Sequence, residues 1–283
     1  MLKSKLKFPA KRQKVSAFSL QPSAFACAGF TMVEIAICLA VMGIALVSII
    51  GVLPIGMNTQ RDNREETLIN QDATVFIEAI RGGARGLDDL TNYVYAITNY
   101  QMFYNGSGVP QPPAVVWGYN YITSAHDTTP MVPPVPINNG TNIIGLLSMP
   151  EYTDINGLPT TTLFSGGYSN HVVAYVHSIS GPAVEKPPQD NDIVVGDSFG
   201  YRILCVNAPV AADINTLGVP YNRQLSANLH ELRLTFLWPQ LANGHLGPGR
   251  QTFRTLVAAQ IVTNMDNQQI LYFYQPQSFV NTP

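Results

Sequence analysis

The sequence has few cysteines, and they form no obvious disulfide pair. Only three occur in 283 residues. Cys27 lies close to the basic N-terminus and Cys38 lies in a long apolar run. Cys205 is therefore the only cysteine in the sequence after the apolar run, and it has no partner there for a disulfide. No paired-cysteine zinc motif is present. The fold must therefore be held by packing, for which the roughly 200 residues after the apolar run are sufficient. We interpret Cys205, in a strand-like run, as a buried and inert thiol.

Positive charge is scarce in most of the chain. The first 29 residues hold six basic residues and no acidic one, whereas residues 30–283 hold the other 10 basic residues and all 18 acidic ones, a net charge of −8. Lys186 is the only lysine in that larger part. An acidic, lysine-poor surface repels phosphate backbones, so we do not expect it to bind nucleic acid. A local cationic patch would be the exception.

Ionisable side chains are almost absent from residues 30–57, where Glu34 is the only one. As a helix with a rise of ~1.5 Å per residue, this segment would be ~42 Å long and would cross the ~30 Å core of a bilayer. An unpaired carboxylate inside such a span is costly, so it normally faces a positive partner. By the positive-inside tendency, the basic N-terminus stays in the cytoplasm and the acidic remainder lies outside it.

The segment that begins at Gly29 reads Gly-Phe-Thr-Met-Val-Glu and follows the basic leader. It resembles the processing site of type IV pilins and type II secretion pseudopilins. The resemblance implies cleavage between Gly29 and Phe30 by a prepilin peptidase, followed by N-methylation of Phe30. It also implies that the new amine of Phe30, in the same or a neighbouring subunit, pairs with Glu34 in a helical bundle. Gly29 would be needed because the peptidase must approach the backbone closely.

The same resemblance implies partners and a location. The partners would be other pilin-like subunits, the prepilin peptidase and an inner-membrane assembly platform. The chain would cross the bacterial inner membrane once and then enter a filament in the periplasm or at the cell surface. Two features depart from the family pattern, because the leader is longer than most and Met32 replaces the usual Leu. The continuation at residues 52–56 is similar to that of prepilin-like cassette proteins of the Verrucomicrobia.

Three ordinary interpretations compete with this resemblance. An uncut single-pass anchor would leave Glu34 without a purpose. A secretory signal peptide fits poorly, because residues 15–28 are only mildly apolar and the hydrophobic region follows the expected cut. A lipoprotein signal at Cys27 lacks both a preceding hydrophobic region and the usual Leu.

After the apolar run, the pattern predicts an amphipathic stem helix from Asn58 to Arg81 that continues the membrane helix. Its apolar stripe has three-and-four spacing and comprises Leu68, Ile69, Ala73, Phe76, Ile77 and Ile80. The glycines at 82, 83 and 86 should end the helix.

The join between the two halves of this helix contains residues that favour local unwinding. Pro54 and Gly56 interrupt it, and proline removes a backbone donor. Gly43 is a further candidate for a flexible or close-packing point, although a small residue is also simply tolerated in a membrane helix. In pilin-like proteins, unwinding in this part of the stem lets subunits pack.

Beyond residue 86, many prolines argue against helix and short apolar runs indicate strands. The runs are 114–122, 142–149, 161–164, 171–179, 193–195, 201–206, 232–238, 251–262 and 269–274. The last three predict an antiparallel meander, with a long connection at 243–249 and a turn at 264–267. The stem should cover the apolar face of the sheet. We therefore predict an α+β fold, the lollipop of pilins, divided at 1–29, 30–57, 58–86 and 87–283.

Two further motifs could carry chemistry. Gly196–Gly200 matches the G-x-S-x-G of a serine nucleophile at Ser198, but the next residues have strand character where a nucleophile elbow needs a helix. The carboxylates of Asp190, Asp192 and Asp197 could hold calcium, although a solvated acidic turn is the favoured interpretation because no Gly-centred twelve-residue loop is present.

We therefore expect a minor pilin-like or pseudopilin subunit and not an enzyme. The minor role is suggested by an exported part that is larger than in many major pilins, with proline-rich loops that are costly to repeat in a filament. One alternative is a membrane-anchored binding protein that does not polymerise, with exposed Tyr-rich and Asn-rich loops at residues 93–121 as its contact surface. The other is a tethered hydrolase built on Ser198.

Overall fold

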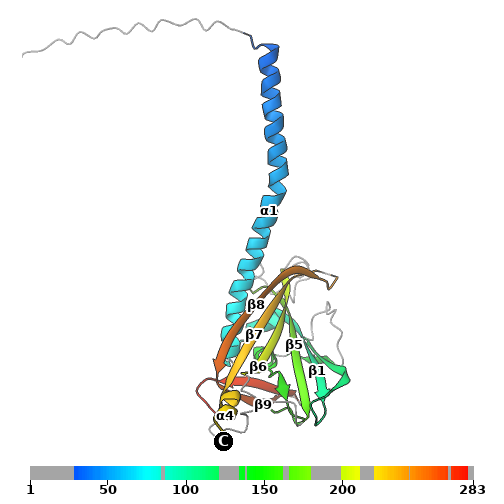
Figure 1. Cartoon of the computed structure of the whole chain (residues 1–283), viewed down its shortest axis with the longest axis vertical. Coiled ribbons are helices and arrows are strands. Elements are labelled where there is room, and N and C mark those ends of the chain that lie inside the picture. Colours follow the sequence, from blue (N-terminus) through cyan, green and yellow to red (C-terminus); the bar gives the residue numbers. More distant parts are fainter. Residues whose placement is uncertain are drawn as a thin grey trace, which may run out of the picture. The chain divides into compact units, whose positions relative to one another are not determined.

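The structure is a computed structural model that describes residues 29–83, 87–120, 134–137, 139–161, 166–179, 199–210, 220–241, 243–266 and 269–279. The chain forms two compact units, Met1–Thr59 and Gln60–Pro283. Helix α1 (Met32–Gly82) belongs to both (Figure 1).

The described part of the first unit is the apolar half of α1. Every side chain from Gly29 to Thr59 is exposed in the isolated chain. The helix is long and apolar enough to cross a membrane, with a mean hydropathy of 2.8 over an 18-residue window. It continues through Pro54, where we expected an interruption. The predicted long apolar helix is therefore confirmed.

The second unit begins with the stem, which we define as Gln60–Gly82. Its buried side chains are Ile69, Asp72, Ala73, Phe76, Ala79 and Ile80, close to the predicted stripe. The helix ends at Gly82, as the glycines predicted. Gly83 follows with a φ of +55°, and a Cβ at this position would collide with the backbone carbonyl of Tyr274. Glycine is therefore required both by conformation and by space.

The main sheet has eight strands in the order β3-β2-β1-β5-β6-β7-β8, with the short β4 paired to β5 (Figure 1). Its pairs are antiparallel except for β2 and β3. The strands are β1 (Val94–Tyr104), β2 (Pro110–Asn120), β3 (Pro134–Pro136), β4 (Tyr152–Thr153), β5 (Gly167–His177), β6 (Gly200–Pro209), β7 (Leu229–Gln240) and β8 (Leu246–Ala258). A helix followed by an antiparallel sheet agrees with the predicted α+β class.

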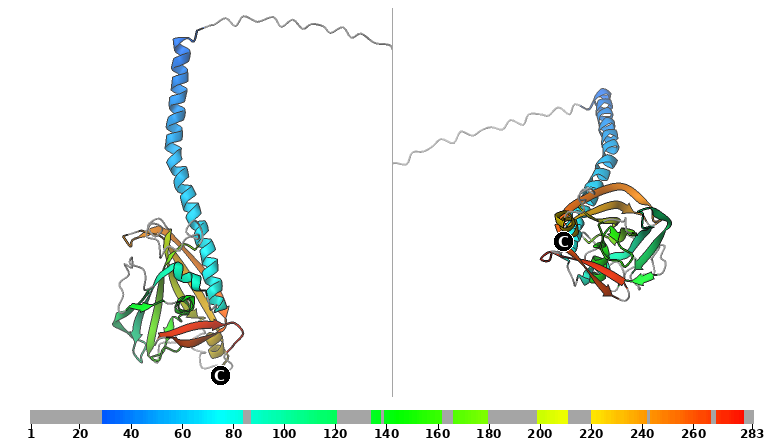
Figure 2. Two further views of the ribbon diagram at one scale, coloured as in Figure 1. Left: turned by 180° about the vertical axis from the view of Figure 1, so that it is seen from behind. Right: turned by 60° about the horizontal axis from the view of Figure 1, so that its bottom comes forward.

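A smaller sheet and short helices complete the second unit. Strands β9 (Gln260–Asp266) and β10 (Gln269–Gln275) form an antiparallel pair that crosses the same end of the main sheet as α4 (Pro220–Asn228) (Figures 1 and 2). Helix α2 (Gly140–Leu147) packs on β10, where a Cβ on Gly145 would lie 2.8 Å from that of Leu271. A 3-10 turn, η1 (Asp88–Asn92), follows the stem.

The core lies between the stem, α2 and one face of the main sheet. Its members include Phe76 from the stem, Ile144 from α2, Ile203 from β6 and Phe236 from β7, all fully buried. Cys205 is also in this core, as predicted, and its thiol donates to the carbonyl of Leu147 at 2.8 Å. Burial raises the pKa of this thiol, which makes it a poor nucleophile.

The prediction of a strand at residues 142–149 was wrong, because this segment forms α2. A short apolar run has no periodicity that separates helix from strand. Asn139 decides the outcome by capping the helix, since its side chain accepts a hydrogen bond from the Asn142 N–H at 2.8 Å. Helix α4 was also not predicted, because its few apolar residues form no clear stripe along one side of the helix. The expected strands at 161–164 and 193–195 lie outside the described residues, apart from Thr161.

Residues 93–120 are not the loops assumed by the alternative of a binding protein, because β1 and β2 form a hairpin there. The strand predicted at 114–122 is confirmed up to Asn120, the last described residue of β2. Strand β1 lies inside the sheet, and hydrogen bonds between polar side chains link it to β5. The amides of Asn99 and Gln101 both donate to Asn170 Oδ1 on β5, at 3.1 and 2.9 Å. The prolines of β2 fit because β3 pairs only with Gly118–Asn120 among the described residues, so Pro110 to Pro113 need no second partner.

The C-terminal meander was predicted only in part. The connection after β7 is a short turn at Leu241–His245, and β8 begins at Leu246. The expected single strand 251–262 is divided at the buried Ala259, whose N–H donates to Asn228 O at 2.8 Å. Strand β9 then leaves the main sheet to pair with β10. The prediction joined two strands because their apolar runs are contiguous.

Candidate functional site

The residues at the expected cleavage site lie outside regular secondary structure and are exposed. Gly29 and Phe30 precede the helix, and Phe30 is 82% exposed. A Cβ on Gly29 would meet no atom within 4 Å, so nothing in the described part of the chain requires glycine there. The bond between them is therefore sterically accessible to another protein, and any requirement for Gly29 would have to come from that protein.

Glu34 lies in the first turn of α1, where it forms a capping box with Thr31. The Thr31 N–H and hydroxyl donate to Glu34 Oε2 at 2.8 and 2.9 Å, and the Glu34 N–H donates to Thr31 Oγ1 at 3.3 Å. The Thr31 carbonyl accepts the first helical bond, from Ile35 N at 3.2 Å. Two of the helix's free N–H groups are therefore satisfied by this pair.

The capping box gives Glu34 a local role that we did not predict. The signal was visible in the sequence, since Thr-x-x-Glu before an apolar run is the pattern of a capping box. Such caps typically stabilise a helix by about 1 kcal/mol. They also provide hydrogen bonds for the carboxylate within one chain. Ion pairing with an amine is therefore not the only way in which this acid can be accommodated.

The remaining residues singled out in the apolar half have no close neighbours in the isolated chain. Added Cβ atoms on Gly43 and Gly56 would meet nothing within 4 Å. Pro54 lies inside the helix and leaves one carbonyl of the preceding turn without its usual donor. If these residues have a packing role, it must therefore be against lipid or another chain.

One carboxylate of the stem has a structural role that was not predicted from the sequence. Asp72 is fully buried, and its Oδ2 accepts hydrogen bonds from three groups of the sheet region. These donors are the Tyr201 hydroxyl at 2.8 Å, the Ser178 hydroxyl at 2.9 Å and the Ile179 N–H at 3.0 Å. Burial and the neighbouring carboxylate raise the pKa of Tyr201, so it remains a donor at neutral pH. Asp72 thus fastens the stem to β6 and to the end of β5.

Several candidate residues fall outside the described residues. They are the leader up to Ala28, the aspartates at 190, 192 and 197, and Ser198. The calcium site remains a prediction. In the described ranges, no group of three or more His, Cys, Asp or Glu side chains could hold a metal ion. The residues after Gly200 form strand β6, the strand character expected from the sequence, whereas a nucleophile elbow leads into a helix.

Comparison with known proteins identified no relative. No protein-family model, no curated protein and no solved structure matches this chain.

Proposed function

We propose that this chain is a minor pilin-like or pseudopilin structural subunit of a type IV pilus or type II secretion-like filament. The observation that carries the proposal is the arrangement of the N-terminus. An exposed Gly29–Phe30 bond outside regular secondary structure stands directly before a helix that holds Glu34 in its first turn and then presents only apolar or small uncharged side chains to residue 57. A processing enzyme needs the first feature, and a membrane-inserted subunit needs the second.

The α+β architecture supports the same proposal. An amphipathic stem on an antiparallel sheet is the arrangement that the family resemblance implies. In a filament, the apolar surface of α1 would be covered by the helices of neighbouring subunits after leaving the lipid. The large exported unit favours a minor subunit or one at the tip.

The processing step can be tested by mass spectrometry of the N-terminus. The protein is taken from its native membranes in cells with and without the prepilin peptidase. We expect a mature chain that begins with N-methylated Phe30, and we expect the uncut leader when the peptidase is missing. A chain that keeps its leader in both strains, or is cut elsewhere, would leave an ordinary membrane anchor.

Glu34→Gln separates the two roles of the carboxylate. Glutamine keeps an oxygen acceptor for the Thr31 N–H, so it preserves the capping box, but it carries no charge to pair with an amine. If assembly depends on an ion pair, Glu34→Gln should insert into the membrane normally and fail to enter filaments. Co-purification with sheared filaments measures this. Normal incorporation would show that capping alone accounts for Glu34.

A further inference from the structure

The chain is acidic, but one face of its main sheet is basic. Strands β5 to β8 contain four arginines and a single acidic residue, Glu231. Arg202 pairs with Leu237, which pairs with Arg250 on its other side. Arg233 pairs with Arg254 and precedes Leu237 by four positions. Directly paired residues and residues an even number apart share a face, so all four arginines lie on one side.

This arginine face is the side of the sheet away from the stem. The residues that alternate with the arginines, such as Ile203 and Phe236, are fully buried in the core beneath. Gln251, next to Arg250, donates to Asn70 of the stem at 3.1 Å. By contrast, the side chains of Arg233 and Arg254 are 37% and 65% exposed. In the described structure, the face is thus open to a partner at these two arginines.

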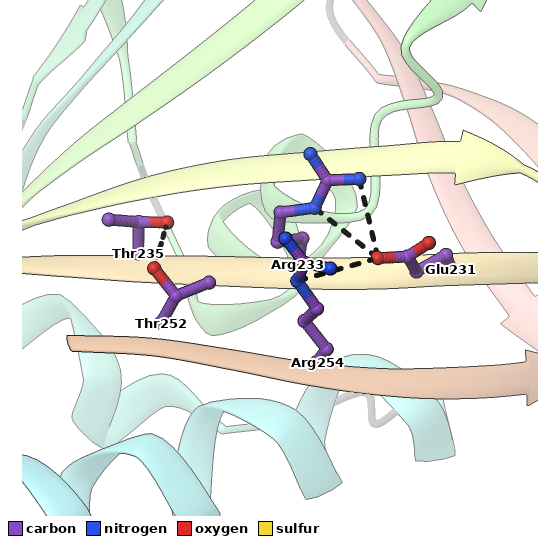
Figure 3. Close-up of polar contacts among 5 residues, drawn as sticks. All are labelled: Glu231, Arg233, Thr235, Thr252 and Arg254. Atoms are coloured by element: carbon purple, nitrogen blue, oxygen red, sulfur yellow. Dashed lines mark hydrogen bonds and ion pairs between the residues drawn. The ribbon is translucent and has the colours of Figure 1, made fainter.

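Among the described residues, Arg233 and Arg254 share a single acidic partner (Figure 3). Nε and Nη2 of Arg233 lie 3.3 Å from Glu231 Oε1, and Nε of Arg254 lies 3.8 Å from the same oxygen. Like charges directly opposite on neighbouring strands repel, and one carboxylate offsets only half of this charge. A second carboxylate supplied from outside would complete the pairing, because guanidinium groups bind carboxylates through several donors.

The other arginines extend the face along the strands. The hydroxyls of Thr235 and Thr252 are hydrogen-bonded at 3.0 Å and occupy the row beyond Arg233 and Arg254. Arg202 and Arg250 lie one row further, ~13 Å from the first pair at ~3.3 Å per residue. Arg202 is held in place, since its guanidinium lies 4.8 Å from the Tyr175 ring centroid and donates to Gly244 O at 2.6 Å. The sheet register therefore sets the spacing of the backbone positions that carry the four arginines.

We propose that the arginine face docks onto the acidic surface of a second copy of this chain. Four arginines and one glutamate give the face a charge of +3, whereas the rest of residues 30–283 has six basic and 17 acidic residues, a charge of −11. The arginine face of one copy is thus complementary to the surface of the next outside that face. Contact between two arginine faces would place like charges together.

Such a contact is heterologous, so it can continue from copy to copy. It goes beyond the proposed function, because a minor subunit mainly contacts other subunits, whereas this contact would join copies of this chain to one another. A long polyanion such as nucleic acid fits less well, since it would extend beyond the face and meet the acidic remainder. The occupant indicated by the charges is therefore a protein surface with carboxylates and few lysines.

The test uses the full chain in nanodiscs that each hold one copy, so that the apolar helices cannot associate. Discs with two lipid colours are mixed, and their association is followed by fluorescence cross-correlation. We expect association that weakens when the salt concentration is raised from about 0.1 M to about 1 M, since the Debye length falls from about 10 to about 3 Å. The double variant Arg233→Gln/Arg254→Gln should weaken it by about 10-fold, which corresponds to about 1.4 kcal/mol.

The matched control is Arg64→Gln/Arg81→Gln, which removes the same charge from the stem and leaves the arginine face intact. It should associate at least as well as the wild type. Tryptophan fluorescence of both double variants checks that the sheet is folded. The proposal is overturned if wild-type discs do not associate, if both variants weaken association equally, or if the face binds only an added single-stranded oligonucleotide. None of these results depends on cleavage after Gly29, so N-terminal mass spectrometry tests the proposed function separately.

Discussion

The two halves of α1 each place one carboxylate among apolar side chains, and they accommodate it differently. Glu34, in the exposed apolar half, is hydrogen-bonded by Thr31, three residues away. Asp72, in the stem, is hydrogen-bonded by groups that are 106 to 129 residues away in the sequence. In both cases, hydroxyl and backbone N–H groups donate hydrogen bonds to the carboxylate. The hydrogen bonds of Glu34 stay within the first turn of the helix, whereas those of Asp72 connect the stem to the main sheet.

The comparison predicts that the stem, and not the apolar half, determines the stability of the sheet. Phe76→Ala should lower the free energy of unfolding by about 3–5 kcal/mol, because it removes a fully buried ring from the core. Ile50→Ala should change it by less than about 0.5 kcal/mol, because Ile50 is 68% exposed and outside the second unit. Denaturant unfolding of the full chain in detergent measures both, since Trp117 and Trp238 lie in the main sheet. Equal effects would contradict the distinction.

Asp72→Asn should give the next largest effect. The amide has nearly the same volume and keeps one oxygen acceptor, but it has no charge, so its hydrogen bonds weaken. One hydrogen bond to a charged group contributes roughly 1.5–3 kcal/mol, and we expect a total loss of about that size. Glu78→Gln is the control, because Glu78 lies on the same helix with a 65% exposed side chain and only a surface ion pair to Arg81. The same unfolding measurement applies. If the two variants behaved alike, Asp72 would not fasten the stem to the sheet.

The contrast between the two carboxylates also explains what the sequence could predict. The apolar helix, the stem stripe and its end at Gly82 depend on local spacing and were predictable. The cap at Thr31 was equally local and could have been found from its pattern. The role of Asp72 could not, because its donors come from β6 and from the residues after β5. A lone acid inside an apolar stripe was the only sign of it.

The same limit applies to the sheet. Alternation was enough to predict β7, but β1 is rich in Tyr, Asn and Gln and resembles a loop. It can lie inside the sheet because Asn99 and Gln101 donate hydrogen bonds to Asn170 on the neighbouring strand β5. These hydrogen bonds depend on the register of the two strands. The arginine face also depends on register, since four arginines on three strands acquire a common side only after folding. Total charge had indicated an acidic surface, to which a local cationic patch would be the exception.

A change of pH should affect the second unit through its buried histidines. Burial lowers the pKa of His230 to about 4, although a hydrogen bond to the Ala227 carbonyl opposes the shift. The unfolded chain has the higher pKa, so it binds more protons below pH ~6.5, and stability falls as the pH is lowered towards ~4. By linkage, His230 should cost about 2 kcal/mol by pH ~5. Unfolding midpoints at neutral pH and at pH ~5 measure this cost. The variant His230→Gln should reduce the pH dependence of the midpoint. An unchanged slope in that variant would assign the effect to other groups, such as His177, whose pKa burial also lowers to about 4.

Thr31→Val should have the smallest effect and should be confined to the first turn of α1. Valine has the same shape as threonine but no hydroxyl, so the Glu34 N–H loses its acceptor and the cap loses about 1 kcal/mol. Thr31→Ser keeps the hydroxyl and serves as the control. Amide hydrogen exchange in nanodiscs should therefore be about fivefold faster at residues 32–35 in the valine variant, with the sheet unchanged. Because Asp72 is tied to the sheet and Glu34 is not, the reverse experiment should differ: Asp72→Asn should speed exchange in β6 and leave residues 32–35 as they are. Faster exchange at both sites in either variant would show that the two halves of the helix are coupled, and the comparison would fail.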